Sequence, residues 1–259
     1  MDNSNNPLPN GVQVDLLLPC LDEAAALPVV LAALPAGFRA IVVDNGSTDG
    51  SRQIARRLGA VVVHQPQRGY GAAVHAGLLA ARADYVAVMD CDGSIVPADI
   101  APLLASVIHG HADLACGRRR PVDRAAWPWH ARWGNHLLAQ LISVGAGSQL
   151  HDIATVRVAR RTDLIELKLT DRRCGYPLET VLRAAENNWR ISEFDIDYHP
   201  RAAGTSSKIS GTARGTAVAV HDFAAVLLQS RRPQRPAAPH IAATRPVLLP
   251  LQASVGASR

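Results

Sequence analysis

The sequence predicts an α/β fold, a single domain whose mostly parallel central sheet is flanked by helices. Short apolar segments rich in branched residues alternate with helical segments five times between residues 12 and 116. Polar residues stand where these apolar segments end, and hydrophobic residues make up 48% of the 259 residues, enough for a substantial core. Strands that alternate with helices pair in parallel through right-handed crossovers, and such sheets bind ligands at the carboxyl ends of their strands.

The first half of the chain supplies the alternating elements. We expect strands over residues 12–19, 40–43, 60–63, 85–89 and 112–116. We expect helices over residues 22–34, 69–82 and 97–109, and one more from the turn at 45–50 to about residue 58. Asp22 is placed to cap the first helix, and Ser47 or Thr48 to cap the second.

The alternation ends at about residue 125. Beyond it we expect helices over 132–144 and 177–187, a last helix ending near residue 228, extended segments over 153–159 and 190–198, and a loop over 202–215. The chain therefore divides into an N-terminal extension (1–11), one domain (12–228) and a tail (229–259). The tail holds five of the 17 prolines and is expected to be disordered.

The charge of the chain argues against a nucleic-acid partner. The formal net charge is +5, but residues 229–259 carry five arginines and no acidic residue. The rest of the chain is balanced, with 22 basic and 22 acidic residues. A domain-wide basic surface for a phosphate backbone is therefore not predicted.

The cysteines and the N-terminus indicate a cytoplasmic protein. The four cysteines include no CxxC pair, so neither a zinc site nor a small disulfide framework is predicted, and we expect free thiols. Cys91 could line a site, although a buried structural role is commoner. Residues 1–10 lack the basic start of a signal peptide. The longest apolar run, residues 24–38, is too short to span a bilayer and contains two prolines.

Asp90-Cys91-Asp92 directly follows the fourth expected strand. Two carboxylates at this spacing can converge on one hard cation, and Mg²⁺ or Mn²⁺ prefers such oxygen ligands. The cation would share its coordination shell with diphosphate oxygens and neutralise charge on a departing nucleoside diphosphate. We therefore expect a metal held by Asp90 and Asp92, with a solvated loop as the alternative.

Asp44 ends the second expected strand, before a dense turn at 45–50. A carboxylate there can accept hydrogen bonds from a nucleobase, or it can simply complete the turn. The first strand is followed by Pro19-Cys20-Leu21-Asp22 and not by a glycine-rich loop. This argues against a dinucleotide-binding Rossmann enzyme, and no Walker-type loop is present either.

The ordered motifs from residue 12 to about 225 resemble the family 2 glycosyltransferases, and within them the dolichyl- or polyprenyl-phosphate hexose synthases. The matching segments are LLLPCLDEAAAL (16–27), IVVDNGSTDGS (41–51), RGYGAAVHAG (68–77), VAVMDCDGS (86–94), DLACGRR (113–119), HDIATVRVARR (151–161), GYPLETVLRAAENNWRISEFDIDYHPR (175–201) and GTSSKISGTARGT (204–216). The resemblance implies a GT-A fold with a smaller acceptor-side C-terminal part. It also implies metal-dependent, inverting transfer of a hexose from a nucleotide-diphosphate sugar of the UDP-glucose or GDP-mannose type to a polyprenyl phosphate.

The resemblance assigns a first group of residues to the donor. Pro19, Glu23 and Asp44 would hold the uridine or guanosine part, and Arg68 and Gly69 would lie near the nucleotide. This adds nucleotide recognition to the metal site expected from the two aspartates.

A second group of residues would contact phosphates. The resemblance places Arg118, after the fifth strand, and Arg132 at the acceptor phosphate. Arg201 and Lys208 flank the Gly-Ser-Thr loop and would close over the diphosphate, since a flexible loop with a cation can act as a lid. A solvated turn is the alternative for that loop.

The acceptor stays open at this point. A phosphate acceptor is already anionic and needs no general base, whereas a hydroxyl acceptor needs one. Glu179 is the first candidate base and Asp152 the second, although Glu179 could equally be an exposed carboxylate in a first helical turn. A non-catalytic nucleotide-sugar-binding protein is a third hypothesis.

Three of the four tryptophans, Trp127, Trp129 and Trp133, lie among arginines before and within the expected helix at 132–144. Aromatic residues interleaved with arginine suit a membrane interface that contains anionic lipid. This pattern predicts peripheral contact with the inner face of a membrane, and a solvated loop before a core-facing helix is the alternative.

Overall fold

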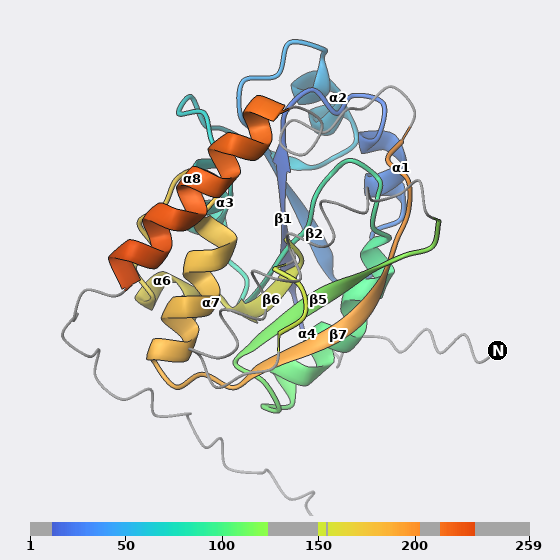
Figure 1. Ribbon diagram of the computed structural model, residues 1–259. Helices are drawn as coiled ribbons and strands as arrows, with labels where there is room; N and C mark the ends of the chain where they lie inside the picture. The colour runs from blue at the N-terminus through green and yellow to red at the C-terminus, as the bar shows by residue number, and fades with distance from the viewer. Residues whose placement is uncertain (1–11, 124–149, 154, 203–212, 231–259) are drawn as a thin grey trace, which may run out of the picture.

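The computed structural model describes residues 12–123, 150–153, 155–202 and 213–230. Its centre is a seven-stranded sheet in the order β3-β2-β1-β4-β6-β5-β7 (Figure 1). The strands are β1 (Val14–Cys20), β2 (Phe38–Asp44), β3 (Val61–His64), β4 (Tyr85–Val88), β5 (Leu114–Pro121), β6 (Arg157–Arg160) and β7 (Ile191–Tyr198). The helices are α1 (Leu27–Ala32), α2 (Ser51–Arg57), α3 (Tyr70–Ala80), the 3-10 helix η1 (Pro97–Ile100), α4 (Ala101–Ile108), α6 (Arg161–Glu166), α7 (Tyr176–Glu186) and α8 (Ala213–Ser230).

The sheet is mostly parallel. Strands β1, β2, β3 and β4 run in one direction, and β5 pairs in parallel with β7. Strand β6 lies antiparallel between β4 and β5. The α/β fold predicted from the alternation of apolar and helical segments is therefore confirmed.

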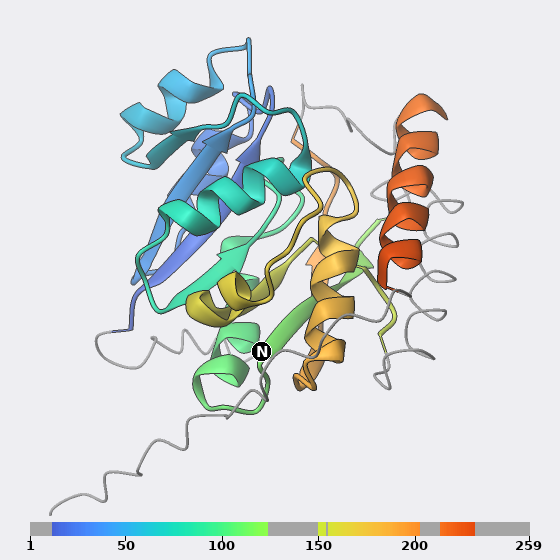
Figure 2. The ribbon, with the colours of Figure 1, turned by 90° about the vertical axis from the view of Figure 1, so that its left-hand side faces the viewer.

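Each face of the sheet is covered by its own hydrophobic core, because successive side chains of a strand point to opposite faces. Leu17 of β1 packs with residues of α3, α6, α7 and α8. Leu16 and Leu18 pack on the other face with residues of α1, α2 and α4. Figure 1 shows these two layers on either side of the sheet, and Figure 2 shows α3, α6 and α7 in front of it.

The first expected helix is shorter than predicted. Helix α1 begins at Leu27, because Asp22 adopts a positive φ of 55° and residues 22–26 form turns instead. The carboxylate of Asp22 does not cap α1; it accepts a hydrogen bond from the backbone N–H of Thr48, at 2.7 Å. The cap predicted for this helix is thus wrong, and the side chain joins two loops.

The second half of the sheet also differs from the prediction. Strand β5 continues to Pro121, because it pairs with β7 along its whole length. The short strand β6 occupies only the end of the extended segment expected at 153–159, and helix α6 was not predicted. The helix expected at 132–144 and the tail lie outside the described residues. No helix among the described residues is both long and apolar enough to cross a bilayer.

Asp15 joins three segments at the amino-terminal end of β1. Its side chain is 1% exposed and accepts hydrogen bonds from Arg39 Nε and Nη2, at 2.7 and 2.8 Å. It also accepts from the backbone N–H groups of Arg82 and Ala83, at 2.6 and 2.9 Å. Burial raises the pKa of Asp15, but these hydrogen bonds lower it more, so that the net shift is downward.

We expect Asp15→Asn to lower the free energy of unfolding by roughly 2 kcal/mol at pH 7, because an amide NH₂ would face donors. The folded-state pKa of Asp15 lies below its unfolded value of about 3.9, so the ionised side chain stabilises the fold above that pH. This stabilisation is lost as the pH falls through the folded-state pKa. The difference between variant and wild type should therefore shrink below about pH 4. Urea unfolding at pH 7 and pH 3 measures this, and a difference that is constant with pH would contradict it.

Candidate active site

Three parallel strands end at one edge of the sheet. Cys20, the last residue of β1, is paired in register with Asp44, the last residue of β2. Strand β4 runs parallel to β1 on its other side and leads directly into Asp90-Cys91-Asp92. The loops that follow these strands, predicted from the polar residues at the strand ends, therefore lie side by side, as expected for the ligand edge of an α/β sheet.

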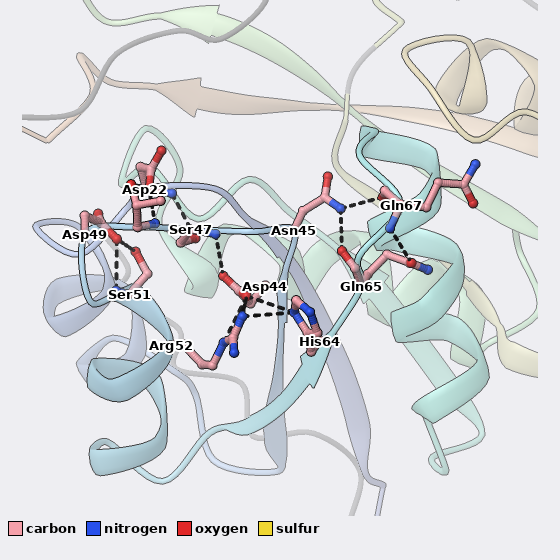
Figure 3. Close-up of polar contacts among 11 residues, drawn as sticks. Asp22, Asp44, Asn45, Ser47, Asp49, Ser51, Arg52, His64, Gln65 and Gln67 are labelled. Atoms are coloured by element: carbon pink, nitrogen blue, oxygen red, sulfur yellow. Dashed lines mark hydrogen bonds and ion pairs between the residues drawn. The ribbon is translucent and has the colours of Figure 1, made fainter.

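The loops after β1 and β2 are joined by side-chain hydrogen bonds to backbone N–H groups (Figure 3). Asp22 N–H donates to Ser47 Oγ at 3.0 Å, and Glu23 N–H donates to Ser51 Oγ at 2.9 Å. The N–H of Ala24 donates to Asp49 Oδ2 at 2.9 Å. The polar side chains of the 45–50 turn thus hold the two loops against each other. Neither Ser47 nor Thr48 caps α2, which begins after Gly50, so the cap predicted for this helix is wrong.

Asp44 is fully buried at the bottom of this edge, and both of its oxygens have partners (Figure 3). Oδ1 accepts from the N–H of Ser47 at 2.9 Å, and Oδ2 accepts from Arg52 Nε at 3.0 Å and lies 3.2 Å from His64 Nδ1. Burial raises its pKa, but the hydrogen bonds from Ser47 and Arg52 outweigh burial and lower the pKa to about 2. Asp44 completes the turn, and its Oδ1, with the N–H of Ser47 as its partner, keeps a second lone pair for a further donor.

Asn45, which the sequence analysis did not single out, joins three segments. Its Nδ2 donates to the carbonyls of Gln65 and Gln67, at 2.9 and 2.7 Å, and its Oδ1 accepts from the N–H of Gly69 at 2.8 Å. An asparagine side chain can do both because it carries a donor and an acceptor. Its place directly after a strand, within a turn, was the signal that could have indicated it.

Arg68 and Gly69 are held tightly where they enter α3. A Cβ on Gly46 would lie 3.1 Å from the guanidinium carbon of Arg68, so the arginine packs over the 45–50 turn. Gly69 has a φ of 144°, and a Cβ there would come within 2.1 Å of the carbonyl oxygen of Arg172. Only glycine fits at this position. Arg68 and Gly69, both predicted to lie near the nucleotide, therefore lie close to the 45–50 turn.

Asp90 and Asp92 lie in different surroundings. Asp92 is 2% exposed; its Oδ1 accepts from the N–H and Oγ of Ser94, at 2.9 and 2.6 Å, and its Oδ2 lies 2.7 Å from Arg201 Nη1. Asp90 is half-buried and accepts a hydrogen bond from Thr155 Oγ1 at 2.9 Å. Burial, and next the charge of Asp92, raise the pKa of Asp90 to about 6. Two carboxylates that destabilise each other in this way fit a cation.

Divalent cations of the Mg²⁺ and Mn²⁺ type suit these residues, because both side chains offer hard oxygen ligands at a partly desolvated strand exit. Among the described residues, no group of three or more His, Cys, Asp or Glu side chains is placed to hold a metal. Asp90 and Asp92 would therefore supply only part of a coordination shell. This is typical of a cation that also binds ligand oxygens.

The segment after β7 is fastened to the Asp90–Ser94 loop. His199 N–H donates to the carbonyl of Ser94 at 2.8 Å, and Ala202 N–H donates to the carbonyl of Asp92 at 3.0 Å. The ion pair of Arg201 with Asp92 lies between these two hydrogen bonds in the sequence. Arg201, predicted from the sequence as a phosphate ligand, thus already stands beside the carboxylates. Lys208 lies outside the described residues.

Arg118 lies within β5, not after it, because the strand runs on to Pro121. Its Nε lies 2.8 Å from Asp195 Oδ1, and its Nη1 lies 3.8 Å from Glu193 Oε2; both partners belong to β7. The placement predicted for Arg118 was therefore wrong by a few residues. Arg132, its expected companion at the acceptor, lies outside the described residues.

Arg119, which the sequence analysis overlooked, is paired with Asp152. The two side chains form a bidentate ion pair at 2.9 and 2.8 Å, and the backbone N–H of Arg119 donates to the same carboxylate at 2.9 Å. Asp152 is 3% exposed, so its carboxylate is shielded from solvent. The positive charge of Arg119 also lowers the pKa of Asp90, but burial raises that pKa by more.

Glu179 is buried in the first turn of α7, so the exposed carboxylate considered as an alternative is wrong. Its two oxygens accept hydrogen bonds from the N–H and Oγ1 of Thr170, at 2.9 to 3.0 Å, and from the N–H of Asp171 at 2.7 Å. Carbonyls of the same loop, those of Arg172 and Arg173, accept from the first N–H groups of α3, at 2.9 Å each. Glu179 therefore holds the loop that supports the start of α3.

Pro19 and Glu23, two of the predicted nucleotide residues, also lie beside these carboxylates. The carbonyl of Pro19 accepts a hydrogen bond from Cys91 Sγ at 3.0 Å, which joins β1 to the Asp90–Asp92 loop. The side chain of Glu23 is 6% exposed. Burial lowers the pKa of Arg201, but the charge of Asp92, with a smaller contribution from Glu23, raises it. The structure thus brings Pro19, Glu23, Asp90, Asp92 and Arg201 to one place.

Comparison with known proteins agrees with this geometry. A family model described as "Glycosyl transferase family 2" matches residues 15–167, and these include the Asp90–Asp92 motif. The chain belongs to glycosyl transferase family 2. An uncharacterized glycosyltransferase of Mycobacterium tuberculosis (strain ATCC 25618 / H37Rv) is 51% identical to this family 2 chain over 213 residues, which cover 82% of the chain and 97% of that protein.

One further relative and one solved structure are similar to this family 2 chain. A dolichyl-phosphate hexose transferase of Haloferax volcanii is 33% identical over 201 residues, covering 76% of the chain and 86% of that protein. Glucosyl-3-phosphoglycerate synthase from Mycobacterium tuberculosis, solved with Mn²⁺, uridine diphosphate and glucosyl-3-phosphoglycerate, has a TM-score of 0.65 at 21% identity, covering 85% of the chain and 80% of that chain. The second likeness confirms the expected GT-A fold.

We expect Arg201→Ala to bind Mn²⁺ more tightly than wild type in the absence of nucleotide, by about tenfold, because the variant lacks the cation that neutralises Asp92. Titration followed by electron paramagnetic resonance measures the free Mn²⁺. Arg120→Ala, which removes an exposed arginine paired with Asp195, is the control and should bind Mn²⁺ as wild type does. Unchanged or weaker Mn²⁺ binding by Arg201→Ala would contradict the idea that Arg201 neutralises Asp92 in place of a metal ion.

We expect Glu179→Gln to lower the free energy of unfolding by roughly 2 kcal/mol, because the amide would turn a donor toward backbone N–H groups. A general base would behave differently, since its loss lowers kcat and leaves stability unchanged. Urea unfolding and initial rates are measured together, with Glu186→Gln, a half-exposed carboxylate on the same helix, as the control. A variant as stable as wild type but with a much reduced kcat would favour the base.

Proposed function

We propose that the protein transfers a hexose, with inversion, from a nucleotide-diphosphate sugar to a polyprenyl phosphate. The observation that carries the proposal is the pair Asp90 and Asp92 at the exit of β4, beside the guanidinium of Arg201. The donor half is supported by family membership and by structural neighbours solved with Mn²⁺ or Mg²⁺ and uridine diphosphate. The acceptor half is supported by the dolichyl-phosphate hexose transferase among the relatives.

The cation would be held by Asp90 and Asp92, where it would neutralise charge on the leaving diphosphate. Arg201 would bind the same phosphates once it leaves Asp92, and we assign Arg68, which packs over the 45–50 turn, to the nucleotide. Together these groups would stabilise the charge that develops as the acceptor oxygen displaces the nucleoside diphosphate. We assign the nucleotide pocket to the edge formed by Pro19, Glu23 and Asp44.

The engagement of the two candidate bases favours a phosphate acceptor over a hydroxyl acceptor. Asp152 is held by Arg119, and Glu179 by backbone N–H groups, so neither carboxylate is poised to take a proton from a substrate. A phosphate oxygen is already anionic and reacts without such a base. Arg118 and Arg132 are the residues we propose for binding that phosphate.

A polyprenyl phosphate lies in a membrane, so the enzyme would work at its cytoplasmic face. Val220 and Leu228 of α8 are 62% and 66% exposed, which agrees with peripheral contact. Trp127, Trp129 and Trp133, the aromatic residues predicted to reach the interface, lie outside the described residues. This contact would deliver the acceptor to the protein without a membrane-spanning segment.

We expect one nucleotide-diphosphate sugar, in the presence of Mn²⁺, to raise the melting temperature of the protein. Ligand at 100 times its Kd stabilises a fold by about 2.7 kcal/mol, which thermal shift detects readily. Asp92→Asn should lose this effect, whereas Asp84→Asn, an exposed carboxylate before β4, should keep it. A panel of uridine and guanosine donors would identify the nucleotide and sugar.

The donor identified in this way is then offered two acceptors, a polyprenyl phosphate in phospholipid vesicles and a soluble phosphorylated hydroxyl compound. Transfer to the lipid supports the proposal. Transfer to the soluble compound alone would replace it with a soluble-acceptor glycosyltransferase, as in the neighbour that uses phosphoglycerate. Absence of stabilisation by any donor would favour a non-catalytic binding protein.

A further inference from the structure

Two cysteines stand opposite each other beside the candidate metal site. Cys20 is the last residue of β1, and Cys91 lies between Asp90 and Asp92. The parallel register pairs Leu17 with Val88, and the hydrogen bond from Met89 N–H to the carbonyl of Leu17 continues it beyond β4. Cys20 and Cys91 are each the third residue after this pair, Cys20 still within β1 and Cys91 in the loop that follows β4.

Both thiols point to the same face of the sheet. Cys20 and Cys91 belong to the hydrophobic cluster that also contains Leu18 and Met89, whereas Leu17 packs on the opposite face. Cys91 Sγ lies 3.0 Å from the carbonyl oxygen of Pro19, the residue joined to Cys20. The two side chains are therefore neighbours.

The spacing of the strands suits a covalent bond between these residues. Adjacent strands lie about 4.8 Å apart, and Cα atoms joined by a disulfide are commonly about 4.4 to 6.8 Å apart. The side chains are 1% and 2% exposed, so an oxidant must reach them through a local opening of the fold. Cys116 on β5 lies opposite Arg157 and Glu193, and Cys174 lies in the loop before α7.

We propose that Cys20 and Cys91 form an oxidisable thiol pair, and that their disulfide weakens metal binding by the adjacent Asp90 and Asp92. Hydrogen peroxide is the oxidant: two S–H bonds break, one S–S bond forms, and the two electrons and two protons reduce the peroxide to two water molecules. A disulfide would pull Cys91 away from the carbonyl of Pro19 and turn the flanking carboxylates. The effect on the metal rests on the proposed function, whereas the disulfide does not.

The test uses the full chain, treated in its native state with hydrogen peroxide, then alkylated, digested and analysed by mass spectrometry. We expect a cross-linked peptide pair containing Cys20 and Cys91, with a mass lower by two hydrogens and reversed by dithiothreitol. Cys91→Ser, whose hydroxyl can still donate to Pro19, should give no such pair, and Cys20→Ser replaces it if that variant fails to fold. Four alkylated thiols after treatment, or a disulfide elsewhere, would overturn the proposal.

The coupling to the metal is measured on the same samples. The oxidised protein should bind Mn²⁺ about tenfold more weakly than the reduced protein, a difference of about 1.4 kcal/mol, and dithiothreitol should restore the affinity. Equal affinities of the two forms would overturn the coupling. A reduced protein that binds no Mn²⁺ would count against the proposed function, while the cross-linked peptide would still establish the thiol pair.

Discussion

The parallel register of β1, β2 and β4 is the constraint on which the candidate site depends. Hydrogen bonding between these strands forces their carboxyl ends to stop at one edge, and the register that pairs Leu16 with both Ala40 and Ala87 fixes where each loop begins. A slip by one residue would turn every side chain of a strand to the opposite face. The two buried cores, which use alternate residues of β1, prevent such a slip.

The balance of buried charge distinguishes the candidate metal site from other buried carboxylates of the fold. Asp15, Asp44 and Asp152 are buried carboxylates, each paired with its own arginine. Asp90 and Asp92 share the cations of their surroundings, and burial together with mutual repulsion raises the pKa of Asp90. Asp15, Asp44 and Asp152 are thus neutralised internally, whereas Asp90 and Asp92 would gain from a further cation.

The fold class and the closeness of Asp90 and Asp92 could be predicted because both depend on local sequence. Alternation of apolar and helical segments indicates a parallel sheet, and the spacing of Asp90 and Asp92 lies within one loop. The roles of Asn45 and Arg119 could not be predicted, because their hydrogen bonds join residues 24 and 33 positions apart. The burial of Glu179 could not be predicted either, because its position in a first helical turn is local, whereas the loop that it holds is set by the packing of α3 on α7.

The pairing of β6 between β4 and β5 also escaped the sequence analysis. An antiparallel strand of four residues carries no periodic signal that separates it from a loop, and only its neighbours in the sheet define it. The length of β5 was underestimated because its second half carries charged side chains, and these are accommodated by acidic partners on β7.

The backbone hydrogen bond from Ala202 to Asp92 has a consequence for how the candidate site can change its partners. Together with the bond from His199 to Ser94, it holds the backbone on both sides of Arg201, whereas the ion pair with Asp92 is made by the arginine side chain alone. Rotation of that side chain would therefore free Asp92 for a metal ion while the backbone stays in place.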